Sequence, residues 1–204
     1  ATKTFLNQVL AFLYLALRLG GHPTDDAQGP AGDLTTLPAR LEAALEAVVE
    51  PVQHVLPALD GCQDLYCLGY GLTYGIALEG ALKLKEITYA HCEGMLSTEF
   101  KHGPLSAVHD GYPVLFVAGP EDVPLLVSAV NEVTCRGGHA IAVAQEDDQL
   151  RRNVHDYLLL PPANPLIDPL LAVLPLQLLS YEMSVARGID PDFPRNLSKT
   201  LTVD

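Results

Sequence analysis

Basic residues are scarce in this sequence. Only 12 lysines and arginines stand against 25 acidic residues, and the formal net charge is −13. Such an acidic surface argues against binding to nucleic acid or to anionic membrane surfaces. It still permits a phosphorylated ligand, because backbone N–H groups at the start of a helix can hold a phosphate locally.

Paired cysteines are absent. Four cysteines are present, and none belongs to a C-x-x-C pair: Cys62, Cys67, Cys92 and Cys135. In a chain of this size, scattered thiols are typical of reduced, mostly buried side chains in a cytoplasmic protein. His91 stands beside Cys92, but the spacing lacks the regularity of a zinc site, and we interpret His91 as structural. The sequence therefore predicts neither a bound metal nor another cofactor.

A long uninterrupted apolar run is also lacking. The strongest candidate, residues 5–17, has about 13 residues, which is too few to span a bilayer. Asn7 and Gln8 interrupt it and no small-residue cleavage pattern follows, so we interpret it as a buried helix and not as a signal peptide. The chain begins at Ala1 and not at methionine, which suggests a processed product or an excised piece.

Apolar residues are plentiful, and their arrangement predicts the fold class. They make up 49% of 204 residues, enough for one well-packed domain. Near-continuous apolar runs are typical of strands that are covered on both faces of a parallel sheet. Four such runs are predicted as strands, at 64–68, 113–118, 140–144 and 157–160. Helical patterns at 73–91, 121–136 and 166–187 alternate with them, which predicts a doubly wound α/β core.

Two further helical patterns precede this core. Residues 3–19 carry apolar side chains on two faces, which indicates a helix that needs a second body, a dimer partner or a missing domain, to cover it. A Gly-, Pro- and Asp-rich linker follows, and a second helix is predicted at 34–55, kinked or restarted at Pro51. The chain is accordingly divided into a helical arm at 1–57, a core at 58–188 and an extended polar tail at 189–204.

One predicted helix carries a candidate set of proton-handling groups. Glu79, Lys83 and Glu86 are spaced by four and three residues, which places them on one face. His102 follows in the turn-like segment KHGP. Acids, a lysine and a histidine can together move protons. The spacing alone leaves two plainer alternatives: a solvated ladder of salt bridges on the helix, and a loop histidine that bonds to its own backbone.

Two loops at the ends of predicted strands are candidate binding elements, because ligands bind beyond the carboxyl ends of strands in open parallel sheets. Gly71 permits close approach of a ligand, and Thr73 can cap the helix that follows. Glu121 and Asp122 begin the other loop's helix, where their charges fill the place of a phosphate and would repel one. This chain is therefore not expected to hold a phosphate by itself.

Three segments resemble one enzyme family. ALEGALKLKEITYAHCEG at 77–94, EFKHGPLSAV at 99–108 and PRNLSKTLTVD at 194–204 resemble the C-terminal half of the glutamine–fructose-6-phosphate aminotransferases, or glucosamine-6-phosphate synthases. The N-terminal segment TKTF at 2–5 and the segment LPARLE at 37–42 are similar too, so the resemblance covers nearly the whole chain. It implies a sugar isomerase (SIS) domain, a flavodoxin-like three-layer αβα sandwich on a mostly parallel sheet of about five strands.

The resemblance also implies roles for individual residues. Glu86 matches the base that moves a proton between C1 and C2 of a sugar imine, with Glu79 and Lys83 as its companions. His102 matches a histidine that is tied to ring opening and supplied across a homodimer interface. Lys199, on composition alone a surface residue of a frayed terminus, matches a tail lysine proposed to form an imine with the open-chain sugar.

The same resemblance implies parts that this chain lacks. In the family, a glutaminase domain makes ammonia, and a first SIS domain carries the serine- and threonine-rich loops that hold the phosphate. Related proteins without a glutaminase domain, the amino-sugar-phosphate deaminases and fructosamine-6-phosphate deglycases, stay open as alternatives. So does a non-catalytic module that senses sugar phosphates, although a sensor has no need of Glu86, His102 and Lys199 together.

Overall fold

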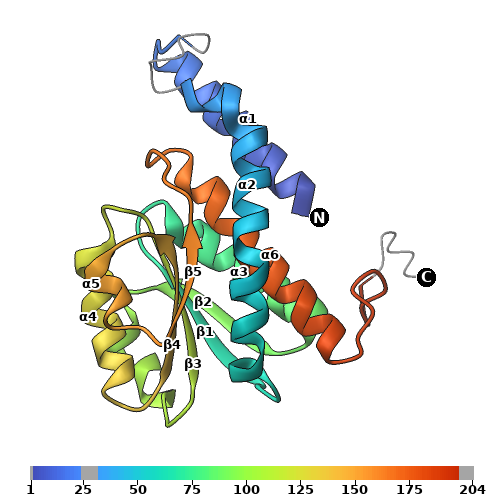
Figure 1. Ribbon diagram of the computed structural model, residues 1–204, viewed down its shortest axis with the longest axis vertical. Coiled ribbons are helices and arrows are strands. Elements are labelled where there is room, and N and C mark those ends of the chain that lie inside the picture. The colour runs from blue at the N-terminus through green and yellow to red at the C-terminus, as the bar shows by residue number, and fades with distance from the viewer. Residues whose placement is uncertain (1, 24–31, 198–204) are drawn as a thin grey trace.

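The computed structural model describes residues 2–23 and 32–197, which form three layers around a parallel sheet (Figure 1). The five strands are hydrogen-bonded in the order β2-β1-β3-β4-β5, and every neighbouring pair is parallel. Their bounds are Asp64–Gly69 for β1, His91–Leu96 for β2, Pro113–Ala118 for β3, His139–Gln145 for β4 and Asp156–Leu160 for β5. The predicted α/β class and the five-stranded parallel sheet are confirmed.

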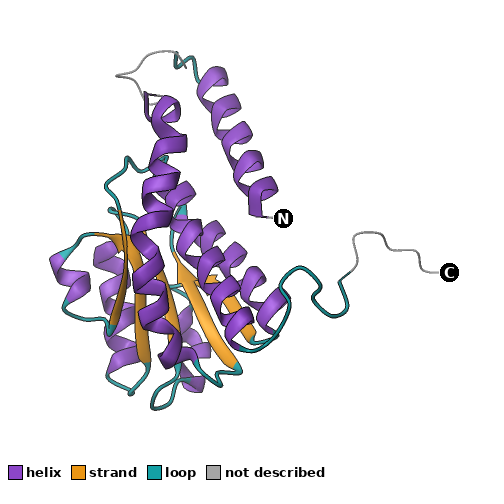
Figure 2. Ribbon diagram, turned by 45° about the vertical axis from the view of Figure 1, so that its right-hand side comes forward, coloured by secondary structure: helices purple, strands orange, loops and turns teal. Residues whose placement is uncertain are grey.

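Helices cover both faces of the sheet. One face packs against α2 (Gly32–Val55), α3 (Thr73–Thr88) and α6 (Asp168–Ala186), while α4 (Val123–Thr134) and the short α5 (Asp148–Arg151) lie on the other face. The remaining helix, α1 (Thr2–Leu19), stands with the first part of α2 beyond one end of the sheet (Figure 2). Three short 3-10 helices complete the order, at Leu56–Leu59, Phe100–His102 and Pro104–Ala107.

Alternate side chains of each strand enter two separate hydrophobic clusters. In β1, Leu65 and Cys67 pack on the α3 side, whereas Tyr66 and Leu68 pack on the α4 side. Every residue of β3 is buried, because both of its faces are covered. This burial on both sides explains the near-continuous apolar runs in the sequence.

The strand β2 was not predicted. We expected a helix to continue to His91, but α3 ends at Thr88, and Tyr89 turns the chain with a left-handed backbone at φ 60°. The reason is that β2 lies at the edge of the sheet and carries exposed His91 and Glu93 on either side of buried Cys92, a half-polar pattern. Smaller errors concern Pro51, at which α2 does not restart, and the starts of α4 and α6, two residues later than predicted.

The helix α6 lies at the centre of the core. It is the only helix in the described part of the chain with the length and hydropathy of a membrane span, and 67% of that span is buried inside the fold. It packs closely on α3, where Gly80 of α3 faces Leu176 of α6 directly: a Cβ on Gly80 would lie 2.5 Å from the Cδ1 of Leu176.

We expect Gly80→Ala to destabilise the protein, although alanine is the better helix former. The added methyl group overpacks the interface at a cost of about 1–3 kcal/mol, which outweighs a propensity gain of at most about 1 kcal/mol. Gly75 on the same helix has nothing within 4 Å of its added Cβ, so Gly75→Ala should leave stability equal or raise it. Urea unfolding of both variants checks this, and equal stabilities would contradict the close α3–α6 contact.

The helix α1 exposes part of its apolar surface. Leu6, Val9, Leu10 and Leu13 pack against the buried ends of α2 and α6. Phe12 and Leu19, in contrast, are 72% and 80% exposed. The helix therefore carries apolar side chains outside its packed surface, and those of Phe12 and Leu19 are uncovered in the described part of the chain.

Candidate functional site

The three charged residues predicted from spacing meet on α3. The Lys83 ammonium donates a 2.6 Å hydrogen bond to Oε2 of Glu86 and lies 3.6 Å from Oε1 of Glu79. The Lys83 side chain is only 8% exposed, and those of Glu79 and Glu86 are 11% and 29% exposed. The alternative of a solvated salt-bridge ladder is wrong, because the lysine at its centre is buried and Glu79 is largely shielded from solvent.

Burial sets the electrostatics of this cluster. Removal from water raises the pKa of Glu79 above its ordinary value, and the nearby Lys83 ammonium opposes that rise. One buried cation therefore serves two carboxylates. A lysine that is held in this way keeps the Glu86 carboxylate in one orientation through Oε2.

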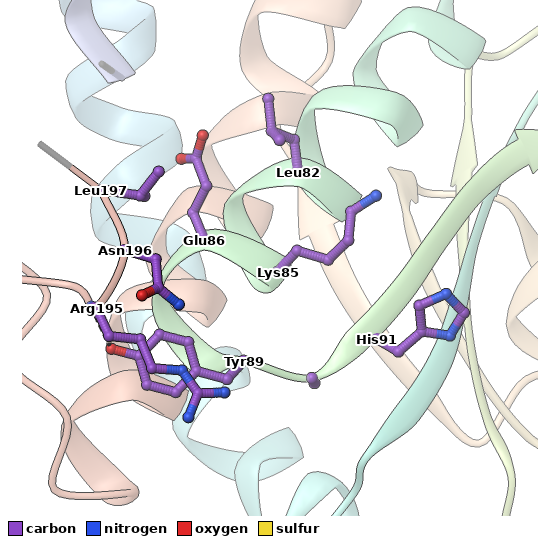
Figure 3. Close-up of a pocket in the computed structure, with 9 residues that line it drawn as sticks. Leu82, Lys85, Glu86, Tyr89, His91, Arg195, Asn196 and Leu197 are labelled. Carbon is purple, nitrogen blue, oxygen red and sulfur yellow. Dashed lines mark hydrogen bonds between the residues drawn. The ribbon is translucent and has the colours of Figure 1, made fainter. Parts of the chain in front are cut away.

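Glu86 also faces a hollow on the surface (Figure 3). The hollow has a volume of about 460 Å³, within the range of small-molecule sites. It lies between the last turn of α3, the start of β2 and the segment Arg195–Leu197 that follows α6; its lining residues are Leu82, Lys85, Glu86, Tyr89, Ala90, His91, Arg195, Asn196 and Leu197. The chain thus places one carboxylate between a buried cation and a space large enough for a small ligand.

His102 does not meet Glu86 within one chain. The segment after β2 crosses to the other face of the sheet, where the ring of Phe100 packs edge-on against Tyr66 with 4.9 Å between the ring centroids. His102 ends this 3-10 helix and is exposed, whereas α3 and Glu86 lie on the opposite face. The sheet separates the two predicted catalytic residues.

Gly71 and Thr73 line a second, smaller crevice at the carboxyl ends of the strands. The crevice has a volume of about 270 Å³ and is bounded by the starts of α3, α4 and α6. Thr73 does not act as the helix cap that we predicted: Leu72 holds the cap position, and the Thr73 hydroxyl accepts a bond from the Tyr70 N–H and donates to the Val117 carbonyl. The hydroxyl is used inside the fold, because it closes the turn and ties α3 to β3.

The Asp122 carboxylate lies at the start of α4, at the place in this crevice where a bound anion would accept backbone hydrogen bonds. Its Oδ2 accepts a 3.1 Å hydrogen bond from the Gly119 N–H and lies 3.3 Å from the Thr73 hydroxyl. Burial raises the pKa of Asp122, and the hydrogen bond from the Gly119 N–H partly offsets the rise. The crevice is also remote from Glu86, since Thr73 and Glu86 are separated by about 20 Å along a helix that rises 1.5 Å per residue. The two candidate sites are therefore separate within this chain.

A family model for the SIS domain matches residues 59–187. The chain belongs to the SIS domain family. The chain is 41% identical over 210 residues to the glutamine–fructose-6-phosphate aminotransferase [isomerizing] of Synechocystis sp., and the match covers 100% of the chain and 33% of the relative. The protein of the same description from Methanothermobacter thermautotrophicus is 39% identical over 207 residues, with 100% and 34% covered.

Solved structures agree with this membership. The C-terminal domain of glucosamine-fructose-6-phosphate aminotransferase from Francisella tularensis matches this SIS domain with a TM-score of 0.71 and 34% identity, covering 78% of the chain and 45% of that structure. The family resemblance found in the sequence motifs is confirmed. The SIS domain described here spans about a third of the length of the curated relatives that it matches.

Some site residues of the SIS domain were missed by sequence reasoning. Tyr89, Arg195, Asn196 and Leu197 line the same hollow as Glu86, and only the motif PRNL hinted at the last three. Lys199, predicted as catalytic, lies outside the described residues, two positions after Leu197. Within the described ranges, no group of three or more His, Cys, Asp or Glu side chains is arranged to hold a metal ion.

Asp168 was also missed, because it reads in the sequence as an ordinary first-turn acid of α6. It is 1% exposed; its Oδ1 accepts a 2.6 Å hydrogen bond from Gln145, and its Oδ2 has no hydrogen-bond partner among the described residues. Burial raises the pKa of Asp168 to about 6, the bond from Gln145 opposes the rise, and the charge of Asp122 adds to it.

We expect Asp168 to make stability depend on pH. Its pKa is about 4 in the unfolded chain and about 6 in the fold, so between these values the folded state keeps a proton that the unfolded state releases. The contribution of Asp168 therefore falls by about 2–3 kcal/mol as pH rises from 4 to 6 and is constant above that. Urea unfolding of the wild type and of Asp168→Asn from pH 4 to 8 measures it. A stability difference that does not change with pH would contradict the assignment.

Proposed function

We propose that this SIS domain supplies the proton-transferring half of an enzyme that isomerises a phosphorylated ketose, converting fructose 6-phosphate and ammonia to glucosamine 6-phosphate. The observation that carries the proposal is Glu86, a carboxylate held by buried Lys83 at the edge of a 460 Å³ hollow. The relatives at 41% and 39% identity are glutamine–fructose-6-phosphate aminotransferases [isomerizing], which supports the same reaction.

The geometry assigns a step to Glu86. Once ammonia has formed an imine at C2 of the open-chain ketose with loss of water, the base removes a proton from C1 and returns it to C2. The C1 hydroxyl gives up its proton and the imine nitrogen gains one, which leaves an aldose with an amine at C2. Lys83 bonds Oε2 of Glu86, so we assign the transfer to Oε1. A positioned base of this kind contributes about 10²–10⁴-fold to a rate. Glu79 shares the ammonium of Lys83 and thereby fixes it from the other side.

The remaining catalytic groups come from outside the described hollow. Lys199 follows Leu197 by two residues, and we propose that it reaches the sugar carbonyl from the tail. His102 is exposed on the opposite face of the sheet from Glu86, so we propose that it serves the hollow of a neighbouring subunit in a homodimer. In this arrangement Lys199 and His102 both contribute to catalysis, and the fold of one subunit does not have to rearrange.

We propose that this chain is part of a longer protein, called the parent protein here, and we assign phosphate binding to another part of it. Asp122 fills the anion position at the carboxyl edge of this sheet and would repel a phosphate. The relatives are about three times as long as this chain, and we propose that a preceding SIS domain in the parent holds the phosphate and covers the exposed face of α1. Buried, unbridged Cys67 and Cys92 agree with a cytoplasmic location, which is part of the proposal.

The test is an assay of the parent protein with fructose 6-phosphate and ammonium in deuterium oxide. We expect glucosamine 6-phosphate that carries solvent deuterium at C2, detected by mass spectrometry, because a base open to solvent exchanges its proton. The 204-residue chain alone is the control and should give no product. A parent protein that forms no product and catalyses no exchange at C1 of the ketose would refute the proposal.

A further inference from the structure

The chain after α6 is led back to the end of α3 by a series of specific contacts. Arg187 is the C-cap residue of α6. Its guanidinium donates a 2.8 Å hydrogen bond to the carbonyl of Thr88 at the end of α3 and another hydrogen bond to the carbonyl of Cys62. The Asp190 carboxylate then accepts a bond from the Asp192 N–H and closes a turn. The tail is therefore directed toward the hollow before it reaches Arg195.

Tyr89 holds this tail at two points. Its hydroxyl accepts a 2.8 Å hydrogen bond from the backbone N–H of Arg195, and the Arg195 guanidinium lies 4.1 Å from the centroid of its ring. Figure 3 shows the two side chains stacked at the mouth of the hollow, with Asn196 and Leu197 leading from them toward Glu86. A bond to the backbone together with a stack on the side chain sets both the position and the direction of the tail.

The backbone conformation of Tyr89 indicates that its side chain makes specific contacts. Tyr89 ends α3 in the left-handed conformation at φ 60°, where glycine or asparagine is the usual residue. A bulky residue at such a position is uncommon, and the strain energy of its backbone has to be offset by contacts that only that residue makes. The contacts with Arg195 are of this kind.

We infer that Tyr89 and Arg195 are positioning residues that hold residues 195–197 at the Glu86 hollow, and that the chemical step proposed there depends on this docking. The inference rests on the proposed function for the identity of the reaction. The docking of residues 195–197 on Tyr89 does not rest on it. The two parts are therefore testable separately.

Docking can be measured on the 204-residue chain itself, which contains no tryptophan. Leu197→Trp places one fluorophore at the hollow. We expect its emission to shift to longer wavelength when Tyr89→Asn or Arg195→Ala is added, because the indole is released to water. Asparagine tolerates the left-handed backbone and so preserves the end of α3, while its side chain is too short to reach Arg195. Arg195→Lys keeps a cation over the ring and should restore the docked emission.

The catalytic consequence is measured in the parent protein. For Tyr89→Asn and Arg195→Ala without the fluorophore, we expect kcat to fall by about 10- to 100-fold while KM for the sugar phosphate changes by less than about twofold, because the tail acts on the chemical step. Arg195→Lys should recover most of kcat. Arg151 lies over the ring of Tyr157 at 4.3 Å on the other side of the sheet, so Arg151→Ala is the matched loss of an Arg–Tyr stack and should change neither readout.

Each outcome decides a different statement. Emission that does not shift in either variant overturns the docking, and a shift without any loss of kcat overturns the positioning role. A fluorescence shift in the 204-residue chain, together with a parent protein that has no isomerase activity at all, refutes the proposed function and the catalytic part of this inference, and leaves the docking of the tail standing.

Discussion

Glu86→Gln in the parent protein is expected to lower kcat by about 10²–10⁴-fold, the scale of a lost general base. Glutamine has the same size and can still accept a hydrogen bond from Lys83, so the end of α3 and the hollow should be unchanged. It cannot take a proton from carbon. The same variant should therefore lose the exchange of sugar-bound hydrogen with solvent deuterium, which reports on the proton transfer more directly than product formation does.

The control for this variant is Glu132→Gln. Glu132 lies on α4, on the opposite face of the sheet from α3, and the substitution makes the same chemical change. It should retain wild-type turnover. Equal activity of Glu86→Gln and the wild type would end the assignment of Glu86. If Glu86→Gln lowers the unfolding temperature, the assay is repeated with Glu86→Asp, which keeps the carboxylic acid and should keep part of the activity.

Mixing two inactive variants is expected to restore activity. If His102 serves the hollow of its neighbour, a dimer of one Glu86→Gln chain and one His102→Asn chain has one site with both defects and one site with none. Random mixing then gives intact sites at about a quarter of the wild-type number in a two-fold dimer. We expect kcat per chain to rise to about that fraction after the two variants are co-expressed or refolded together.

This experiment depends on the separation of the two residues by the sheet. Phe100 packs on Tyr66 at the α4 face, and Glu86 lies on the face of α3. The control is each variant refolded alone, which should stay inactive while remaining dimeric by sedimentation. Mixed samples that are dimeric and no more active than the two separate variants would show that His102 acts in its own subunit or not at all.

The sequence alone determined the features that depend on local spacing. Glu79, Lys83 and Glu86 had to share a face once α3 formed, because the helical repeat places residues three and four apart side by side. The fully covered strands β3 and β4 were visible as apolar runs for a similarly local reason, since both of their faces enter the core. The family motifs then identified the SIS domain, which the comparisons confirm.

Only the tertiary structure decided what lies between distant segments. It buried Lys83 and so excluded the solvated ladder, placed His102 on the far face of the sheet and made HCEGML an edge strand. It also left one oxygen of Asp168 without a hydrogen-bond partner among the residues that the structure describes. It also brought Arg195 onto Tyr89, across 106 residues of sequence. Such pairings depend on which surfaces pack together, and the helical and strand periods record only which way a side chain points from its own backbone.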